Sequence, residues 1–173
     1  EEIVAKTKSD LALIGVNPTY PSSKYGYIVP EEVASQNDII HVKKFTEKPT
    51  EIEASNLINS GALWNCGVFS FKLDYIIKML TELGLPTDYD HLLANYDLLP
   101  KISFDYQVVE KASKITVLPY NGYWKDLGTW NTLTEEMGTT KIGKGTISPD
   151  SVNTHLVNEL SIPVCVIGTS NLV

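Results

Sequence analysis

The stretch IIHVKKFTEKPTEIEASNLINSGALWNCGVFSF, residues 39–71, decides the fold. Its first part alternates between apolar and polar residues, which is typical of a strand, and a proline ends that strand. Thr50 and Glu53 then form a T-x-x-E capping box, and Gly61 stands where a helix C-cap belongs. Residues 62–71 return to strand composition. A strand, a helix and a second strand in direct succession predict an α/β layered domain.

The rest of the chain alternates in the same way and then changes character. Strands are predicted at 11–16, 115–119 and 123–124. Helices are predicted at 72–86, 103–114 and 128–138. The last stretch, 139–173, consists of short β runs split by turn residues. We therefore expect an α/β domain over residues 1–138 and the start of a separate β-rich region over residues 139–173.

The composition is that of a globular domain with an acidic balance. The chain has 173 residues, 43% of them hydrophobic, with a formal net charge of -7 at pH 7 and a sequence pI near 4.9. One sizeable core can be buried at this size. The negative charge argues against a nucleic-acid partner or an anionic membrane surface. No apolar run approaches membrane-spanning length, so we expect no membrane partner.

Cysteine content, lysine content and the first residues add three expectations. Cys66 and Cys165 lie far apart in apolar runs, which is typical of buried thiols in a reducing compartment, so we expect a cytoplasmic protein. All fourteen basic residues are lysines, so a bound phosphate would be held by ammonium groups, backbone N–H groups or a metal, not by an arginine fork. The opening EEIVAKTKSD has no initiator methionine and no signal-peptide pattern, and we expect a fragment of a longer protein.

Two short motifs before residue 50 carry candidate ligand contacts. Gly26 lies between tyrosines in KYGYI; taken alone it is typical of a β-bulge, although a missing side chain also lets a ligand reach backbone N–H groups. Glu47 and Lys48 lie side by side in FTEKP, at the end of a predicted strand. A carboxylate can accept two sugar hydroxyls, and an ammonium gives a phosphate a compact charge. An isolated Glu-Lys pair is more often two solvated charges.

Two further candidates follow. Asn65 lies inside the apolar run LWNCGVF, and leaving a buried amide unpaired costs about 1–3 kcal/mol. It pairs either with neighbouring backbone, the alternative that we favour, or with a ligand hydroxyl. Asp126, in YWKDLGTW, precedes a predicted helix and is either a turn or N-cap residue or an oxygen ligand for Mg²⁺. The three histidines show no metal-ligand spacing.

Five motifs in this order resemble the sugar-nucleotide pyrophosphorylases: NPTYPSSKYGYI, FTEKP, LWNCGVFSF, SFDYQVVEKASKITVLP and YWKDLGTW. The resemblance is greatest to the bacterial mannose-1-phosphate guanylyltransferases, also called GDP-mannose pyrophosphorylases, and runs from residue 11 to the end of the chain. It implies a partial Rossmann-like nucleotidyltransferase fold, a mixed sheet with flanking helices, followed by the start of that family's β-rich C-terminal region. It also implies, for the complete protein, the conversion of GTP and mannose 1-phosphate to GDP-mannose and pyrophosphate.

The resemblance assigns roles to the candidate residues as well. It implies that the backbone of Gly26 faces the sugar and that Asn65 lies beside it. It implies that Glu47 binds the sugar hydroxyls, while Lys48 binds the sugar phosphate and takes part in catalysis. Asp126 matches the family's catalytic, Mg²⁺-binding aspartate. The sugar phosphate attacks the α-phosphorus in line, so positioning and charge neutralisation carry the reaction and no covalent protein nucleophile is implied.

Departures from the family pattern limit this hypothesis. The family's Gly-rich nucleotide loop, of the type G-G-x-G-T-R, and its second metal aspartate have no counterpart here. We therefore expect an incomplete Mg²⁺ site and no nucleotidyl transfer by the isolated chain.

Two alternatives stay open: the same reaction on another sugar and base, such as glucose 1-phosphate with UTP or TTP, and a noncatalytic module that binds a sugar phosphate or a partner chain. An α/β domain without its front part should expose a sheet edge or apolar face, which favours a homo-oligomer.

Overall fold

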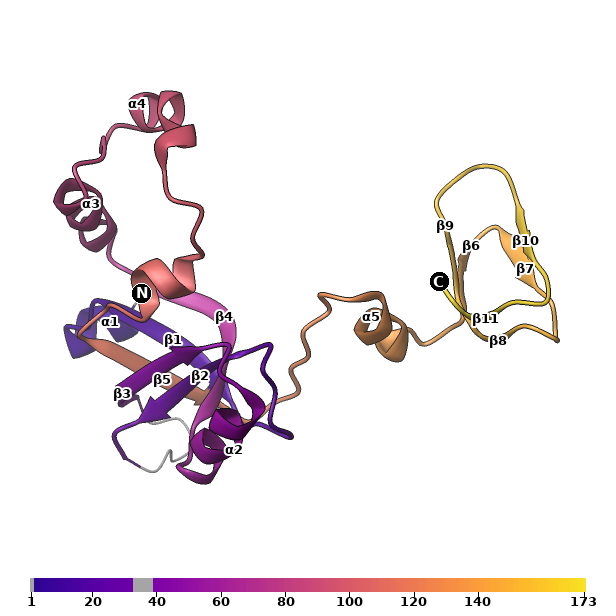
Figure 1. Cartoon of the computed structure of the whole chain (residues 1–173), viewed down its shortest axis with the longest axis horizontal. Helices are drawn as coiled ribbons and strands as arrows, with labels where there is room; N and C mark the ends of the chain where they lie inside the picture. The colour runs from indigo at the N-terminus through magenta and orange to yellow at the C-terminus, as the bar shows by residue number, and fades with distance from the viewer. Residues whose placement is uncertain (1, 33–38) are drawn as a thin grey trace. The chain divides into compact units, whose positions relative to one another are not determined.

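The chain folds into two compact units. The computed structural model describes residues 2–32 and 39–173 (Figure 1). The units comprise Glu1–Tyr123 and Trp124–Val173. This division falls before the helix predicted over 128–138, whereas the predicted domain limit follows that helix. The predicted boundary between an α/β domain and a β-rich region, after residue 138, stays a prediction.

A five-stranded mixed sheet forms the centre of the first unit (Figure 1). Its strands are β1 (Leu11–Val16), β2 (Gly26–Pro30), β3 (Ile40–Glu47), β4 (Leu63–Phe71) and β5 (Ile115–Tyr120). The strand order is β1-β4-β2-β3-β5, and the sheet closes as a barrel because β5 pairs parallel to β1 and antiparallel to β3. The predicted α/β architecture with a mixed sheet is confirmed.

The closure of this sheet changes the expectation of an uncovered edge. Strands β3 and β5 pair only at their first contacts, Ile40 with Val117 and His41 with Thr116, so the later part of β3 extends beyond this ladder. The edge between the described strands is therefore partly covered. Large apolar side chains are exposed on another segment of the first unit, at Leu83, Tyr89, Leu93, Tyr96, Leu98 and Ile102. Self-association through an apolar surface stays a prediction.

The core of the first unit lies against one face of the strands, because alternate strand residues point the same way. Its buried side chains are Leu11, Leu13, Ile28, Ile40, Phe45, Leu63, Val108, Val109, Ile115 and Val117. Ile28 of β2 is opposite Phe45 of β3, and two residues along each strand Gly26 is opposite Glu47. Glu47 therefore continues the core-facing row of β3 and lies at its end.

The helix between β3 and β4 follows its sequence signals. Helix α2 spans Glu51–Asn59, and Thr50 and Glu53 form the predicted capping box, with the Glu53 backbone N–H donating to Thr50 Oγ1 and the Thr50 N–H donating to Glu53 Oε2. Gly61 follows the helix with φ +80°, a left-handed conformation that glycine adopts readily. This short connection brings the chain from the end of β3 back into the sheet as β4.

The remaining segments of the first unit depart from prediction in places. They are α1 (Glu2–Thr7), α3 (Leu73–Glu82), α4 (Tyr89–Ala94), the 3-10 helix η1 (Tyr96–Leu98) and the π-helix η2 (Asp105–Val109). The helix predicted over 103–114 was wrong in length and type, because the run winds as a π-helix that buries both Val108 and Val109. The strand predicted at 123–124 was also wrong, because both residues have an irregular backbone. Helices α1 and α4 were not predicted.

The second unit confirms the β-rich expectation for the end of the chain. It contains helix α5 (Trp130–Glu136) and the strands β6 (Lys141–Gly143), β7 (Gly145–Ile147), β8 (Val152–Thr154), β9 (Leu156–Asn158), β10 (Val164–Val166) and β11 (Ser170–Leu172). Each strand of the first three pairs in parallel with its counterpart among the last three: β6 with β9, β7 with β10, and β8 with β11. The chain thus makes two successive turns of a parallel β coil, an arrangement in which each turn stacks on its neighbour.

A membrane-spanning helix is not among these elements. Over residues 2–32 and 39–173, every helix is too short or too polar to cross a bilayer.

Candidate sugar-phosphate site

Three predicted residues meet at one end of the sheet in the first unit. Gly26 begins β2, Glu47 ends β3, and these two residues are direct cross-strand partners. On the other side of β2, Tyr27 is opposite Trp64, which places Asn65 of β4 next to the same end. Residues opposite each other on neighbouring strands point to the same face of the sheet, and Glu47 Oε2 and Asn65 Cβ both lie next to the position of a Cβ atom on Gly26.

Gly26 is needed because its neighbours fill the space that a side chain would take. A Cβ atom built at Gly26 would lie 2.5 Å from Glu47 Oε2, 2.8 Å from Phe45 Cζ and 3.3 Å from Asn65 Cβ. The first two separations are closer than carbon atoms tolerate. The glycine thus makes room for the Glu47 carboxylate, and this packing role stands beside the predicted exposure of its backbone to a ligand.

The Glu47 carboxylate is buried and only partly satisfied. Its side chain is 7% exposed, and Oε1 lies 3.4 Å from Lys48 Nζ. Oε2 is buried without a hydrogen-bond partner among the residues that the structure describes. Burial raises the pKa of the Glu47 carboxyl above its ordinary value, and the nearby Asp105 carboxylate raises it further, against the opposing effect of the Lys48 ammonium. A buried acceptor of this kind is suited to a hydroxyl donor.

Lys48 has an uncommon backbone conformation at the exit from β3. Its φ is 45°, in the left-handed region that residues with side chains seldom occupy. Its backbone N–H donates to the Tyr25 carbonyl at 3.2 Å, and its side chain is half exposed. Residues held in such conformations are enriched in binding sites, where neighbouring structure imposes them.

Both ends of the Asn65 amide have partners. Nδ2 donates to Asp105 Oδ1 at 3.0 Å, and the Gly67 backbone N–H donates to Asn65 Oδ1 at 3.1 Å. The favoured pairing with neighbouring backbone is therefore found at the oxygen, whereas the nitrogen pairs with a side chain from η2. Since Nδ2 carries two hydrogens, the second can bind an acceptor such as a sugar hydroxyl oxygen.

Two acidic residues of this site carried no role in the sequence interpretation. Asp105 contacts Asn65, and Glu110 Oε1 accepts a hydrogen bond of 2.8 Å from the Glu47 backbone N–H. Both lie in the quoted motif SFDYQVVEKASKITVLP. In an α-helix two residues five apart would lie about 140° apart around the axis, so the predicted helix gave no reason to group them. The π-turn, closed by the Glu110 N–H on the Asp105 carbonyl at 2.9 Å, is what brings them to one site.

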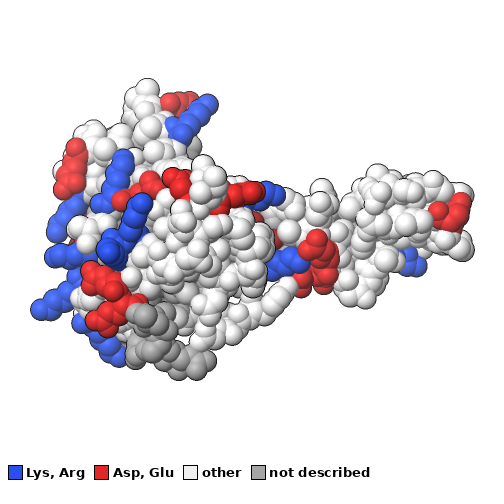
Figure 2. All heavy atoms as spheres, turned by 60° about the horizontal axis from the view of Figure 1, so that its bottom comes forward, with Lys and Arg blue, Asp and Glu red and all other residues white. Residues whose placement is uncertain are grey.

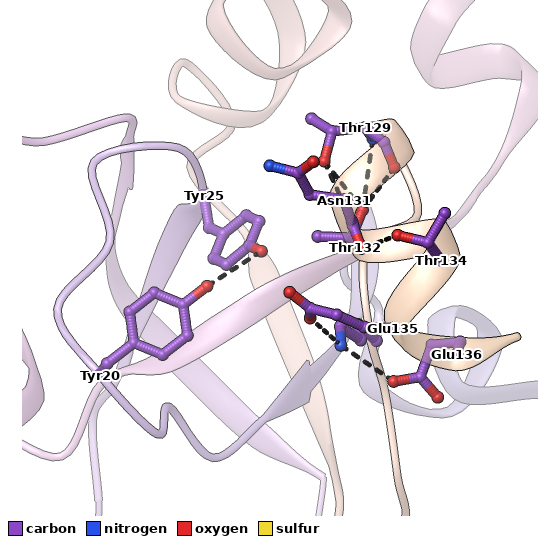
Figure 3. A network of polar contacts seen from close by, with 9 residues as sticks. Tyr20, Tyr25, Thr129, Asn131, Thr132, Thr134, Glu135 and Glu136 are labelled. Atoms are coloured by element: carbon purple, nitrogen blue, oxygen red, sulfur yellow. Dashed lines mark hydrogen bonds and ion pairs between the residues drawn. The ribbon is translucent and has the colours of Figure 1, made fainter. Parts of the chain in front are cut away.

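An aromatic cluster packs on the opposite face of the same strands. The Trp64 ring lies 5.0 Å from the Tyr20 ring and 4.9 Å from the Tyr25 ring, both in edge-to-face geometry. The Tyr20 and Tyr25 hydroxyls are 3.3 Å apart (Figure 3). Since Tyr25 precedes Gly26 and Trp64 precedes Asn65, this cluster stiffens the strand ends that carry the site.

Asp126 belongs to the second unit, and the structure does not place it with the other predicted residues. Its Oδ1 accepts a hydrogen bond of 3.0 Å from the Gly128 backbone N–H, as expected for a turn aspartate. The adjacent Lys125 pairs with Glu135 at 2.6 Å and with Glu136 at 2.9 Å, at the end of α5 (Figure 3). These two carboxylates raise the pKa of the Lys125 ammonium.

The described residues do not by themselves fit a magnesium ion. Across that part of the chain, no three His, Cys, Asp or Glu side chains gather as a metal-binding group. Asp126 offers one carboxylate, and one of its oxygens already accepts from Gly128. Magnesium requires an octahedral set of oxygen ligands, most of which would have to come from elsewhere.

The fold and the sequence motifs place this chain in a family of transferases. Residues 1–141, which are most of the chain, match the nucleotidyl transferase family, and the chain belongs to that family. A solved structure with a similar fold is described as mannose-1-phosphate geranyltransferase from Thermus thermophilus; it is 26% identical, with a TM-score of 0.64, over 98% of this chain and 55% of that one.

Two curated relatives match most of this chain. A mannose-1-phosphate guanylyltransferase of Salmonella montevideo is 31% identical over 90% of this chain and 39% of its own length. The alginate biosynthesis protein AlgA of Pseudomonas putida is 28% identical over 98% of this chain and 39% of its own length. The chain therefore spans about two fifths of the curated relatives that it matches. The predicted resemblance to mannose-1-phosphate guanylyltransferases is confirmed.

Proposed function

We propose that this chain carries the sugar-phosphate-binding part of a mannose-1-phosphate guanylyltransferase, an enzyme that converts GTP and mannose 1-phosphate to GDP-mannose and pyrophosphate. The observation that supports this most directly is the buried Glu47 Oε2, which lacks a hydrogen-bond partner among the described residues and lies above Gly26 beside Asn65. A sugar hydroxyl is a small neutral donor that satisfies such an oxygen, and pairing it would remove the cost of leaving it bare.

Each residue then has a distinct task. Glu47 accepts a sugar hydroxyl, and Asn65 donates its second amide hydrogen to another. The half-exposed Lys48 ammonium, which is 3.4 Å from Glu47 Oε1, binds the phosphate attached to the same sugar. Held in this way, a phosphate oxygen attacks the α-phosphorus of the nucleotide and pyrophosphate leaves, a reaction that depends on positioning and on neutralised charge. By family resemblance we propose Asp126 as one ligand for Mg²⁺, an ion whose full ligand set the described residues of this chain do not assemble.

Two alternatives keep parts of this proposal. The same reaction on another sugar and base, such as glucose 1-phosphate with UTP or TTP, would use the same site, with the Glu47 carboxylate accepting from one sugar hydroxyl and the Asn65 amide nitrogen donating to another. A noncatalytic module that binds a sugar phosphate or a partner chain would use the same residues without the transfer step. We propose that the isolated chain binds the sugar phosphate without transferring a nucleotide.

A calorimetric titration with mannose 1-phosphate tests the proposal. Lysines and acidic residues are interspersed on the face of the first unit seen in Figure 2, so the test needs a lysine control. Lys43→Ala removes the same charge from an exposed position on β3. We expect saturable binding that is stronger for mannose than for glucose 1-phosphate, is lost in Lys48→Ala and is kept in Lys43→Ala. Equal loss in both variants, or no binding by the wild-type chain, would contradict the proposal.

A further inference from the structure

We infer that Asp105 and Glu110, at the two ends of the π-helix η2, are positioning residues that hold Asn65 and Glu47 in the orientation needed to bind sugar hydroxyls. This inference rests on the proposed function for the identity of the ligand. The positioning itself rests on two hydrogen bonds, Asn65 Nδ2 to Asp105 Oδ1 at 3.0 Å and Glu47 N–H to Glu110 Oε1 at 2.8 Å.

Asp105 fixes which way the Asn65 amide faces. In the observed orientation the nitrogen donates to Asp105 and the oxygen accepts from the Gly67 N–H. Exchanging the two ends would lose both bonds, and it would set the amide oxygen against a carboxylate and the amide nitrogen against another donor. Asp105 thus keeps the amide nitrogen of Asn65, and not its oxygen, on the side that faces Asp105. The second hydrogen of that nitrogen is then the group that Asn65 offers to a ligand.

Glu110 takes the place of a strand partner for the end of β3. The ladder between β3 and β5 ends at His41, so the Glu47 backbone N–H lies beyond it and donates to the Glu110 carboxylate. The next N–H, of Lys48, donates to the Tyr25 carbonyl. Two consecutive backbone groups are therefore held from opposite sides, and they are the ones that carry the Glu47 and Lys48 side chains.

The π-turn explains how one short segment serves both strands. The Glu110 N–H closes the π-turn on the Asp105 carbonyl at 2.9 Å, and the buried Val108 and Val109 anchor the turn in the core. Widened turns of this kind are often found at functional sites, because they bring together residues that an α-helix would separate. The segment η2 therefore connects β4, through Asn65, with the end of β3.

The charges of this cluster match a sugar better than a phosphate. Asp105 and Glu110 both oppose ionisation of Glu47 and raise its pKa, and Lys48 is the cation that offsets them. Three carboxylates would repel a phosphate placed among them, whereas each can accept a hydroxyl. The acidic cluster and Lys48 thus set the direction in which a sugar phosphate enters, with its ring toward η2 and its phosphate toward Lys48.

The test compares alanine with amide variants at both positions. Asp105→Ala and Glu110→Ala should each weaken mannose 1-phosphate binding about tenfold, the effect of losing one hydrogen bond to a charged group. Asp105→Asn and Glu110→Gln keep an acceptor oxygen and should recover most of the affinity. Asp97→Asn, an exposed acidic position in η1, is the matched control and should bind as wild type. Alanine variants that bind as tightly as wild type, or amide variants that bind no better than alanine, would overturn the inference.

A second readout separates this inference from the proposed function. In a nitrogen-15 NMR spectrum, the Asn65 side-chain amide is identified by its absence in Asn65→Ala. We expect Asp105→Ala to shift this resonance and speed its hydrogen exchange, and Asp105→Asn to lower the pKa of Glu47 by removing a neighbouring negative charge. If the wild-type chain binds no sugar phosphate, the proposed function fails; if the amide and the Glu47 titration do not respond, the positioning role fails.

Discussion

Two carboxylates that the family resemblance assigns to the site, one in each unit, have very different surroundings. Glu47 is buried at the end of the core-facing row of β3, and its neighbours come from β2, β4 and η2. Asp126 is exposed and accepts from Gly128, two residues away. The same family resemblance picked out both residues. Glu47 is held by contacts with segments that are distant in the sequence. Asp126 is held by a turn of adjacent residues.

The largest expected effect comes from filling the space above Gly26. Gly26→Ala places a methyl group 2.5 Å from Glu47 Oε2 and 2.8 Å from the Phe45 ring. Because both neighbours are packed against the core, we expect the free energy of unfolding to fall by about 1–3 kcal/mol and mannose 1-phosphate binding to be lost. Chemical denaturation and calorimetry measure the two effects.

The control for this variant is Gly138→Ala, where a Cβ would meet nothing within 4 Å. It should change stability by less than about 0.5 kcal/mol. Equal stability of Gly26→Ala and Gly138→Ala would show that Glu47 does not fill the site, and the contrast between the two carboxylates would disappear.

Local signals were read well from the sequence, because they depend on a few adjacent residues. The capping box of Thr50 and Glu53 and the buried run 11–16 needed no knowledge of distant partners. The meeting of Gly26, Glu47 and Asn65 depends on strand register across three strands, so it could be expected only through family resemblance. The roles of Asp105 and Glu110 were missed because a 3.6-residue period hides a π-turn.

Closure of the sheet also depends on residues that are distant in the sequence, and it was not predicted. The contact of Ile40 with Val117 joins two strands that are far apart in the sequence. Composition predicts that both are strands, but it does not state which strands are neighbours. The pair at 123–124 shows the reverse: both residues are aromatic and typical of strands, yet their backbone is irregular.

A smaller effect should appear when the charge of Glu47 is removed. In the folded chain the pKa of Glu47 is raised, chiefly by burial and then by Asp105, with Lys48 opposing and Glu110 adding to the increase. The folded state therefore binds this proton more tightly than the unfolded state, and ionisation costs stability. The cost is absent below the ordinary pKa of 4.5 and is complete once the pH exceeds the raised value.

Glu47→Gln should therefore gain stability over wild type as the pH rises from 4 to 7. We expect a gain of about 1 kcal/mol at pH 7, the lower end of the cost of a buried unpaired polar group, together with weaker sugar binding. Urea unfolding at both pH values measures it. Asp126→Asn, measured at pH 7, should stay within about 0.5 kcal/mol of wild type because its turn bond needs only one oxygen. A difference between Glu47→Gln and wild type that does not change with pH would contradict the burial of the charge.

The smallest expected effect separates the backbone of Lys48 from its charge. Lys48 and Lys8 both have left-handed backbones, with φ of 45° and 54°. Replacing either by glycine relieves that strain but adds freedom to the unfolded chain, so each variant should be neutral to more stable by about 1 kcal/mol. The two should differ in binding, since Lys48→Gly removes the ammonium beside Glu47 and Lys8→Gly removes one between α1 and β1. Thermal unfolding and calorimetry with mannose 1-phosphate test the pair. If Lys48→Gly binds as well as Lys8→Gly does, the strained backbone at the end of β3 serves the fold of the turn before Pro49, and the phosphate is held by another group.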